Sequence, residues 1–264
     1  MSNFDIEKPK IAIVIPARID GTRLPGKVLM EFYGIPMVEH VRRRAKLNKH
    51  SVDVFVATGD EEVATMVQRH GGKILKTYNQ HENGTSRCAE ASQQLDCDFV
   101  LIVQGDELLI LPRHIDLLIE RINQNKEIVF FNAVAPLTKH NELNDASVVK
   151  CAIDKNEKII FMFRKSPVTK EADTHLNSQW KVLGLFAIKK ELLQHLNTLS
   201  NTPFYLSESI EQLKLIENGI EVTSVLQDIS YPSLNTSRDI QEIYRNIEES
   251  VEQQNILQST LINA

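Results

Sequence analysis

Short apolar runs rich in β-branched residues, each followed by a helical pattern, constrain the fold of this chain more than any other feature. The runs at 11–15 and 99–103 are unbroken, which is typical of strands buried on both faces of a sheet. Two further strands and three helices are expected between and beside them: strands 52–57 and 73–76, helices 38–47, 61–70 and 85–95. Strands that alternate with helices at this spacing pair in parallel through crossover helices. We therefore predict an α/β fold, with a mostly parallel twisted sheet and helices on both of its faces.

The pattern changes in the second half of the chain. A helix at 112–124 and a strand at 128–137 continue the alternation, but 147–153 and 158–163 read as two strands of a hairpin, and 180–188 is again strand-like. We expect one domain over 1–264, carrying a small antiparallel insertion at about 147–190 as a lid or dimerisation surface. Three elements are expected to complete it: a helix at 207–217, a strand at 220–226 and a C-terminal helix with the apolar stripe Ile240, Ile243, Ile247 and Val251.

Charge and hydropathy exclude several classes of protein. The net charge of −5 argues against a general binder of nucleic acids or membrane surfaces, so functional cations must be local. No apolar run is long enough to cross a bilayer, and we expect a cytoplasmic location. The basic run Arg42, Arg43 and Arg44 on the helix 38–47 is expected to be a solvated helix face.

The three cysteines show none of the spacings that bind metals. Cys88, Cys97 and Cys151 lack a CxxC or Cys/His pattern. We expect reduced, partly buried thiols.

The loop after the first strand carries the densest functional signal. Residues 16–27 hold two glycines and the cations Arg18, Arg23 and Lys27. Glycines let the backbone approach a ligand closely, and fixed positive charges suit a polyphosphate. Val28 stands where a Walker A loop needs a hydroxyl for Mg²⁺, so a P-loop is a poor second reading. The alternative to a phosphate site is a basic loop that binds nothing.

Two further segments fall where ligands bind in such sheets, outside the carboxyl ends of the strands. Gly84 and Thr85 form a turn into a helix, with Arg87 as a positive anchor; Thr85 could equally be the helix cap. Residues 104–107, Gln-Gly-Asp-Glu, directly follow a buried strand. The Asp106 carboxylate, facing a cationic phosphate loop, suits Mg²⁺, although Gly-Asp is also ordinary turn chemistry.

Together these segments resemble the 3-deoxy-D-manno-octulosonate (Kdo) cytidylyltransferases, the CMP-Kdo synthetases of lipopolysaccharide biosynthesis. The resemblance covers nearly the whole chain. It rests on residues 16–18, 22–27, 84–87 and 104–107, and on the Glu-Gln-Leu helix at 207–213.

The resemblance implies a glycosyltransferase-A-like nucleotidyltransferase fold, a homodimer, Mg²⁺ as cofactor, and transfer of CMP from CTP to an acidic 2-keto-3-deoxy sugar. Lys27, Arg18 and Asp106 would be catalytic, with Asp106 and Asn235 at the metal. The nucleotide would contact Ala17, Arg18, Thr22, Arg23, Lys27, Gly84, Thr85 and Arg87. The sugar would contact Gln104, Arg164, Glu211 and Gln212.

The chain departs from the family pattern at the expected metal and sugar contacts. Asn235 replaces an acidic metal ligand; its amide can coordinate Mg²⁺ without charge, but we favour capping of the last helix by Asn235 or Thr236 with Asp239. Val182 and Phe186 replace a histidine and a tyrosine expected against the sugar, which predicts a modified Kdo such as an amino-deoxy relative. The alternatives are another acidic sugar, such as a nonulosonic acid, or a non-catalytic nucleotide-binding homologue.

Overall fold

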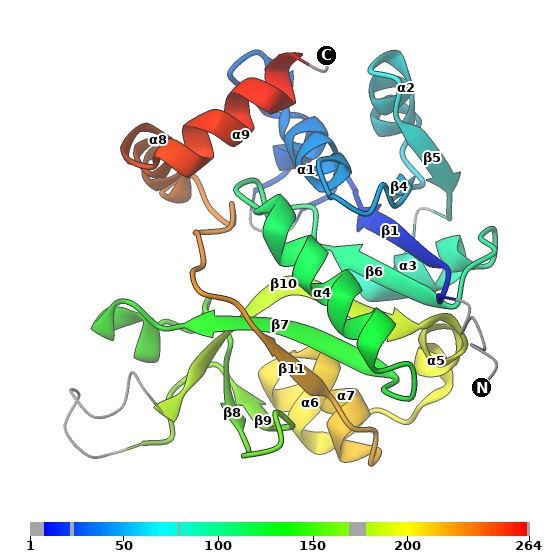
Figure 1. The fold of residues 1–264 in the computed structure, drawn as a ribbon, viewed down its shortest axis with the longest axis vertical. Helices are drawn as coiled ribbons and strands as arrows, with labels where there is room; N and C mark the ends of the chain where they lie inside the picture. Colours follow the sequence, from blue (N-terminus) through cyan, green and yellow to red (C-terminus); the bar gives the residue numbers. More distant parts are fainter. Residues whose placement is uncertain (1–7, 22–23, 79, 169–177, 263–264) are drawn as a thin grey trace, which may run out of the picture.

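The computed structural model describes residues 8–21, 24–78, 80–168 and 178–262, and these form a nine-stranded mixed sheet with helices on both faces (Figure 1). Its main path runs β11-β7-β10-β6-β1-β4-β5. Four neighbouring strands pair in parallel: β6 (Phe99–Val103), β1 (Ile11–Pro16), β4 (Val54–Thr58) and β5 (Lys73–Lys76). The predicted α/β class and mostly parallel sheet are confirmed.

The long strand β10 (Trp180–Lys189) lies inside this sheet and runs antiparallel to both of its neighbours, β6 and β7 (Phe130–Pro136). Beyond β7, the strand β11 (Thr223–Leu226) pairs in parallel. Only the hairpin of β8 (Lys150–Ile153) and β9 (Ile159–Phe163) branches off, through pairing of β8 with β10. The segment predicted as an insertion at about 147–190 therefore contributes a central strand as well as a hairpin.

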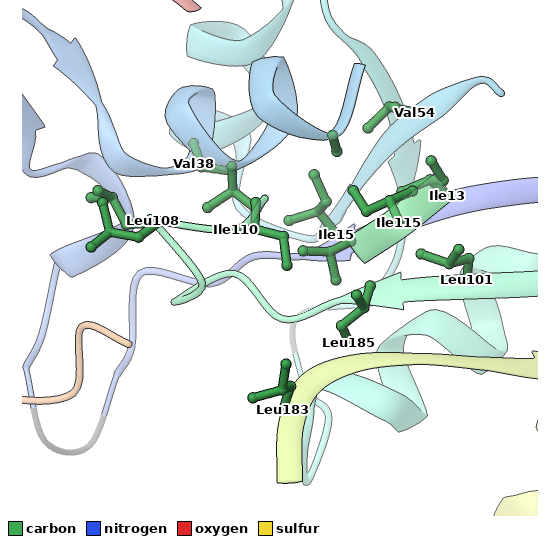
Figure 2. Close-up of a cluster of buried hydrophobic side chains, with 14 of the residues drawn as sticks. Ile13, Ile15, Val38, Val54, Leu101, Leu108, Ile110, Ile115, Leu183 and Leu185 are labelled. Carbon is green, nitrogen blue, oxygen red and sulfur yellow. The ribbon is translucent and has the colours of Figure 1, made fainter. Parts of the chain in front are cut away.

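Alternation of side chains along the strands divides the core into two layers. On one face, Ile13, Ile15 and Leu101 form one cluster with residues of α1 (Met37–Lys46) and α4 (Pro112–Gln124), and Figure 2 labels Val38 from α1 and Ile115 from α4. The helices α2 (Glu61–Arg69), α8 (Asp239–Glu249) and α9 (Val251–Ile262) complete this layer. The other face carries α3 (Gly84–Ser92), α5 (Lys190–His195) and α7 (Glu211–Glu217).

Several elements differ from the sequence prediction. The helix expected at 207–217 is two helices, α6 (Pro203–Glu208) and α7, because Ser209 adopts a left-handed conformation with φ of 52°. The C-terminal helix is likewise divided, at Ser250, into α8 and α9. Among the short features that were not predicted are the helix α5 and the strands β2 (Glu31–Phe32) and β3 (Ile35–Pro36), which pair with each other.

The basic run on α1 is buried, so the prediction of a solvated face is wrong. Arg42 and Arg43 both bind the fully buried Glu39, at N–O distances of 2.7 and 3.0 Å. Arg44 donates to Gln253 Oε1 on α9 at 2.6 Å. The prediction weighed the cations alone. Glu39, one turn earlier, neutralises two of them, and α9 covers the third.

The predictions about the cysteines and about membrane-spanning segments can be compared with the structure directly. All three cysteines are free thiols, with Cys88 and Cys151 buried and Cys97 partly buried, as expected. Among the described residues, every helix is too short or too polar to cross a membrane.

Candidate active site

The cationic loop after β1 and the acidic turn after β6 meet at one end of the sheet. Lys27 Nζ lies 3.0 Å from Asp106 Oδ2 and donates a second hydrogen bond to the carbonyl oxygen of Leu234 at 2.8 Å. The two side chains are 20% and 25% exposed, so solvent or a ligand can reach the pair. An ammonium carries three N–H donors, which leaves one for a ligand oxygen.

A cavity of about 180 Å³ opens beside this pair, between the loop after β1, the start of α3 and the turn after β6. Most of the residues predicted for the nucleotide line it: Ala17, Arg18, Lys27, Gly84 and Arg87, together with Gln104 and Asp106. Thr85 does not line it, and Thr22 and Arg23 lie outside the described residues. Segments far apart in the sequence thus form one polar cavity beside a lysine–aspartate pair.

Two glycines allow the cavity wall to close tightly. A Cβ atom on Gly105 would lie 2.6 Å from the carbonyl oxygen of Pro16, much closer than van der Waals contact. A Cβ atom on Gly84 would lie 2.9 Å from Gln104 Oε1. The ends of β1 and β6 can therefore approach each other this closely only with glycine at position 105, whereas a side chain at position 84 would displace the end of the Gln104 side chain.

The first turn of α3 is capped by Asn83, so the alternative of Thr85 as the cap is wrong. Asn83 Oδ1 accepts from the Ser86 N–H at 2.8 Å, and the Ser86 hydroxyl accepts in return from the Asn83 N–H. The Thr85 hydroxyl is buried and takes no part in this cap. This helix start is fixed without Thr85.

The Arg87 guanidinium is held in place from behind the cavity. It donates to the Thr77 hydroxyl at 2.6 Å and to the Tyr78 carbonyl oxygen at 3.0 Å. Arg87 is only 2% exposed, and burial lowers the pKa of its guanidinium. Arg18, by contrast, is exposed and donates one 3.3 Å bond to the carbonyl oxygen of His81. Of the two arginines that line the cavity, one is thus fixed and the other can adapt to a ligand.

A second, larger cavity of about 720 Å³ lies on the other side of Asp106. Glu107, Lys181, Val182 and Asn235 are among its lining residues. Burial, and secondarily the negative charge of Asp106, raises the pKa of Glu107 to about 7. Asp106 is the sequence-predicted residue that borders both cavities, which suits a group placed between two substrates.

The donor set around Asp106 fits Mg²⁺ in its usual protein environment. Mg²⁺ is commonly bound through one or two carboxylates, with waters and substrate phosphates completing its octahedron. The described residues hold no group of three or more histidine, cysteine or acidic side chains suited to a metal. A metal here would therefore depend on the bound triphosphate, with Asp106 as its carboxylate and the Asn235 amide beside the same cavity.

The predicted helix cap by Asn235 or Thr236 takes a different form in the structure. Asp239 Oδ2 accepts hydrogen bonds from the backbone N–H groups of Asn235 at 2.8 Å and Thr236 at 2.6 Å. Neither of the two side chains caps α8, which begins after Arg238 without a side-chain cap. The carboxylate of Asp239 holds the turn, so capping does not occupy the Asn235 amide.

The residues predicted for the sugar do not lie together. Gln212, in the first turn of α7, donates to the Oδ1 atom of the buried Asn132 at 3.0 Å. Burial raises the pKa of the neighbouring Glu211 carboxyl, and the Thr85 hydroxyl partly offsets this shift. Glu211 and Gln212 thus lie on the α3 side of the sheet, while Gln104 lines the smaller cavity.

Arg164 lies apart and lines neither cavity. Its guanidinium donates to the carbonyl oxygens of Glu208 at 2.6 Å, Ala146 at 2.8 Å and Ser209 at 3.0 Å. Recognition of a sugar carboxylate would require these bonds to be exchanged. That role remains a prediction.

The two departures at the expected sugar contacts have different surroundings. Phe186 is 2% exposed and stacks on Phe130, with ring centroids 5.4 Å apart and an interplanar angle of 15°. Val182 lines the larger cavity. Only Val182 therefore borders a cavity.

Sequence reasoning missed several residues that hold the site together. The Leu234 carbonyl oxygen and the Asn132 amide give no motif signal, because each depends on long-range packing. Gly184, which interrupts the apolar run of β10, could have been noticed, since glycine inside a strand often marks a bulge or a close approach.

Comparison with known proteins places this geometry in a family. The sequence profile described as Cytidylyltransferase matches residues 12–228. A 3-deoxy-manno-octulosonate cytidylyltransferase of Chlorobium limicola is 35% identical, covering 90% of this chain and 97% of the relative. A protein of the same name from Escherichia coli is 30% identical, covering 89% and 94%.

Solved structures agree. The structure of CMP:2-keto-3-deoxy-manno-octonic acid synthetase complexed with CTP matches with a TM-score of 0.84 at 30% identity, covering 91% of this chain and 99% of that one. The inositol-1-phosphate CTP transferase from T. maritima shares the fold, with a TM-score of 0.63 at 15% identity, covering 93% of this chain and 98% of that one. The chain therefore belongs to the cytidylyltransferase family and, within it, to the 3-deoxy-manno-octulosonate cytidylyltransferases.

Proposed function

We propose that this chain catalyses the reaction of CTP with Kdo or a closely related 2-ulosonic acid to give the CMP-sugar and pyrophosphate, a step that supplies lipopolysaccharide biosynthesis. The observation that carries the proposal is the pairing of Lys27 with Asp106 at 3.0 Å on the wall of the cavity that also holds Arg18 and Gly84. A cation and a carboxylate fixed together at the carboxyl ends of two parallel strands suit a nucleoside triphosphate with its metal.

The reaction needs positioning and charge neutralisation more than covalent help from the protein. The anomeric hydroxyl of the sugar attacks the α-phosphorus, the new O–P bond forms, and the bond to the β-phosphate oxygen breaks in line. The hydroxyl proton passes to solvent water, and pyrophosphate leaves with the electron pair of the broken bond. Lys27 and Arg18 would neutralise the triphosphate and the charge that develops on the leaving group.

Mg²⁺ is proposed as the cofactor, bound to the Asp106 carboxylate and assisted by the Asn235 amide. When bound, it would polarise the α-phosphate and balance its charge. The lysine also lies against this carboxylate, so its ammonium and the metal would share Asp106 or exchange on it. An Asn235→Asp variant tests the metal role, because added charge should tighten Mg²⁺ binding.

Pyrophosphate release with CTP, Mg²⁺ and Kdo is the direct test of the proposal. We expect turnover with CTP in preference to UTP or ATP. Lys27→Ala and Asp106→Ala should each lower kcat by about 10²–10³-fold, the usual cost of removing one preorganised charge. Lys73→Ala is a matched control, because the side chain of this lysine is 56% exposed, pairs with Asp53 on the surface at 2.7 Å and lines neither cavity. Equal loss in the control variant would refute the assignment.

A panel of acidic sugars separates the remaining candidates. It should include Kdo, an amino-deoxy Kdo and a nonulosonic acid, each with the wild-type protein. Preference for the amino-deoxy sugar would support the prediction made from Val182 and Phe186. Release with none of them, while CTP still binds, would point to a non-catalytic nucleotide-binding protein.

A homodimer is proposed as the working assembly, with the β8–β9 hairpin and α6 as its contact surface. Ile160 on β9 and Phe204 and Leu206 on α6 are between 51% and 63% exposed. Exposed apolar side chains on a strand and on a helix that contacts it are typical of an association surface. Sedimentation should give a dimer that Ile160→Asp with Leu206→Asp converts to monomer; an unchanged dimer would place the interface elsewhere. A cytoplasmic location is part of the same proposal and is tested by fractionation.

A further inference from the structure

Glu107 directly follows Asp106, the proposed metal ligand. It accepts hydrogen bonds that a catalytic role of its own does not explain. Its Oε1 atom accepts two hydrogen bonds, from the Gly184 N–H at 3.1 Å and from the Ser233 hydroxyl at 2.9 Å. The donors come from β10 and from the segment before α8, which are separated by 77 and 126 residues from Glu107. One carboxylate oxygen therefore joins three distant segments of the chain.

The contact with β10 is shaped for this carboxylate. The pairing of β10 with β7 changes register between Val182 and Phe186, which is where Gly184 lies. A Cβ atom on Gly184 would be 2.5 Å from Glu107 Oε1, so any other residue here would force the carboxylate to shift from its present position. The Gly184 carbonyl oxygen also accepts from the Gln104 N–H at 2.8 Å. Gly184 thus holds the turn after β6 from both ends.

The contact with Ser233 reaches the other partners of Asp106. Ser233 precedes Leu234, whose N–H donates to the Asp106 carbonyl oxygen at 3.0 Å. The carbonyl oxygen of Leu234 accepts from Lys27 Nζ at 2.8 Å. The hydrogen bonds of Glu107 therefore fix the main chain on both sides of the Lys27–Asp106 pair.

We propose that Glu107 is a positioning residue that sets the place of the Asp106 carboxylate for the metal–nucleotide complex, acting through Gly184 and Ser233. This inference rests on the proposed function, because it assigns Asp106 to Mg²⁺. Residues that orient a metal ligand from behind typically contribute about 10–100-fold to metal affinity or activity. The rival reading makes Glu107 a second ligand of the metal.

Glutamine and alanine at position 107 distinguish the two readings. The Glu107→Gln side chain keeps one carbonyl oxygen that can accept from both Gly184 and Ser233, but it carries no charge. Glu107→Ala removes the acceptor altogether. A positioning role requires glutamine to preserve Mg²⁺ binding and alanine to lose it, whereas a charged ligand would be lost in both variants.

The readout is Mg²⁺ binding at equilibrium to the full chain with CTP and without sugar, measured by isothermal titration calorimetry. We expect Glu107→Ala to weaken Mg²⁺ binding by about 10–100-fold. We expect Glu107→Gln to stay within about threefold of wild type, and Ser233→Ala, which loses one of the two bonds, to fall between. The Kd for CTP without metal should not change in any of them.

The control is Asp116→Ala. Asp116 lies on α4, away from both cavities, and is 4% exposed. Its carboxylate accepts a hydrogen bond from the Lys49 N–H at 2.7 Å. The Asp116→Ala substitution should lower the melting temperature of the protein without changing its Kd for Mg²⁺. Equal weakening in Glu107→Gln and Glu107→Ala would overturn the proposal in favour of a metal ligand. Wild-type affinity in Glu107→Ala would overturn it outright.

The proposed function fails by a different measurement. If wild-type protein released no pyrophosphate with any sugar, the Mg²⁺ titrations with CTP alone would still report on Glu107.

Discussion

Replacing Gly105 by alanine should damage the active site more than it damages the fold. The added Cβ atom would lie 2.6 Å from the Pro16 carbonyl oxygen, about 0.8 Å short of the 3.4 Å at which ordinary contact begins. The Pro16 oxygen belongs to the main chain and the Cβ atom is fixed rigidly to it, at the ends of β1 and β6, so no flexible side chain can move aside. One of the two strand ends, and with it either Asp106 or the loop that carries Lys27, must be displaced by that amount.

The expected magnitude follows from this displacement. Misplacement of a catalytic group by about 1 Å can cost about 10²-fold in rate, so kcat/KM should fall by a factor approaching 100. Overpacking of this kind typically costs about 1–3 kcal/mol of stability. For a chain of this size that corresponds to a fall in Tm of about 2–12 °C.

The assay compares Gly105→Ala with Gly219→Ala in pyrophosphate release and thermal unfolding. Gly219 follows α7 with φ of +77°, and a Cβ atom there would meet nothing within 4 Å. Its replacement should cost about 1–2 kcal/mol through the left-handed backbone alone. We expect both variants to lose a similar amount of Tm, and only Gly105→Ala to lose activity. Wild-type kcat/KM in Gly105→Ala would refute the reasoning.

Three further outcomes are expected. Asn132→Ala should raise KM for the sugar about fivefold through Gln212, with KM for CTP unchanged in steady-state kinetics. Burial lowers the pKa of His40 and of His114 to about 4. Each histidine therefore contributes stability that is complete above pH 6.5 and is lost as the pH falls towards 4. In urea unfolding, the free energy of unfolding should fall by up to about 1.4 kcal/mol per pH unit for each histidine. Glu39→Gln leaves two buried arginines short of a charge partner and should cost about 3–5 kcal/mol, measured by chemical denaturation; a loss below 1 kcal/mol would contradict this.

The local sequence pattern was sufficient to predict at which end of the sheet the site lies. Lys27 and Asp106 follow two unbroken apolar runs, and the carboxyl ends of parallel neighbours meet at one edge. The order of strands could not be predicted in the same way. Periodicity identifies β10 as a strand but not as a neighbour of β6 and β7, because strand pairing is decided by contacts far apart in the sequence.

Charged residues show the same limit in a different form. The arginines of α1 look solvated in sequence because the chain contains no local sign that α9 will cover them. Arg164 fits a family position, yet its guanidinium binds three carbonyl oxygens around Ser209, where a predicted helix is broken. The chemistry of each side chain could be predicted from its residue type. Where the side chain points depends on local backbone conformation, such as the helix break at Ser209, which the sequence pattern does not show.

The central place of β10 has a consequence for synthesis on the ribosome. Its neighbour β6 is complete by Val103, whereas β10 ends at Lys189, so the nascent chain carries β6 for many residues with one edge unpaired. An apolar strand with free main-chain groups invites pairing with other chains. Fragments that stop before Trp180 should therefore aggregate when expressed, and release of a shortened polypeptide would be a hazard for the cell rather than a source of partial activity.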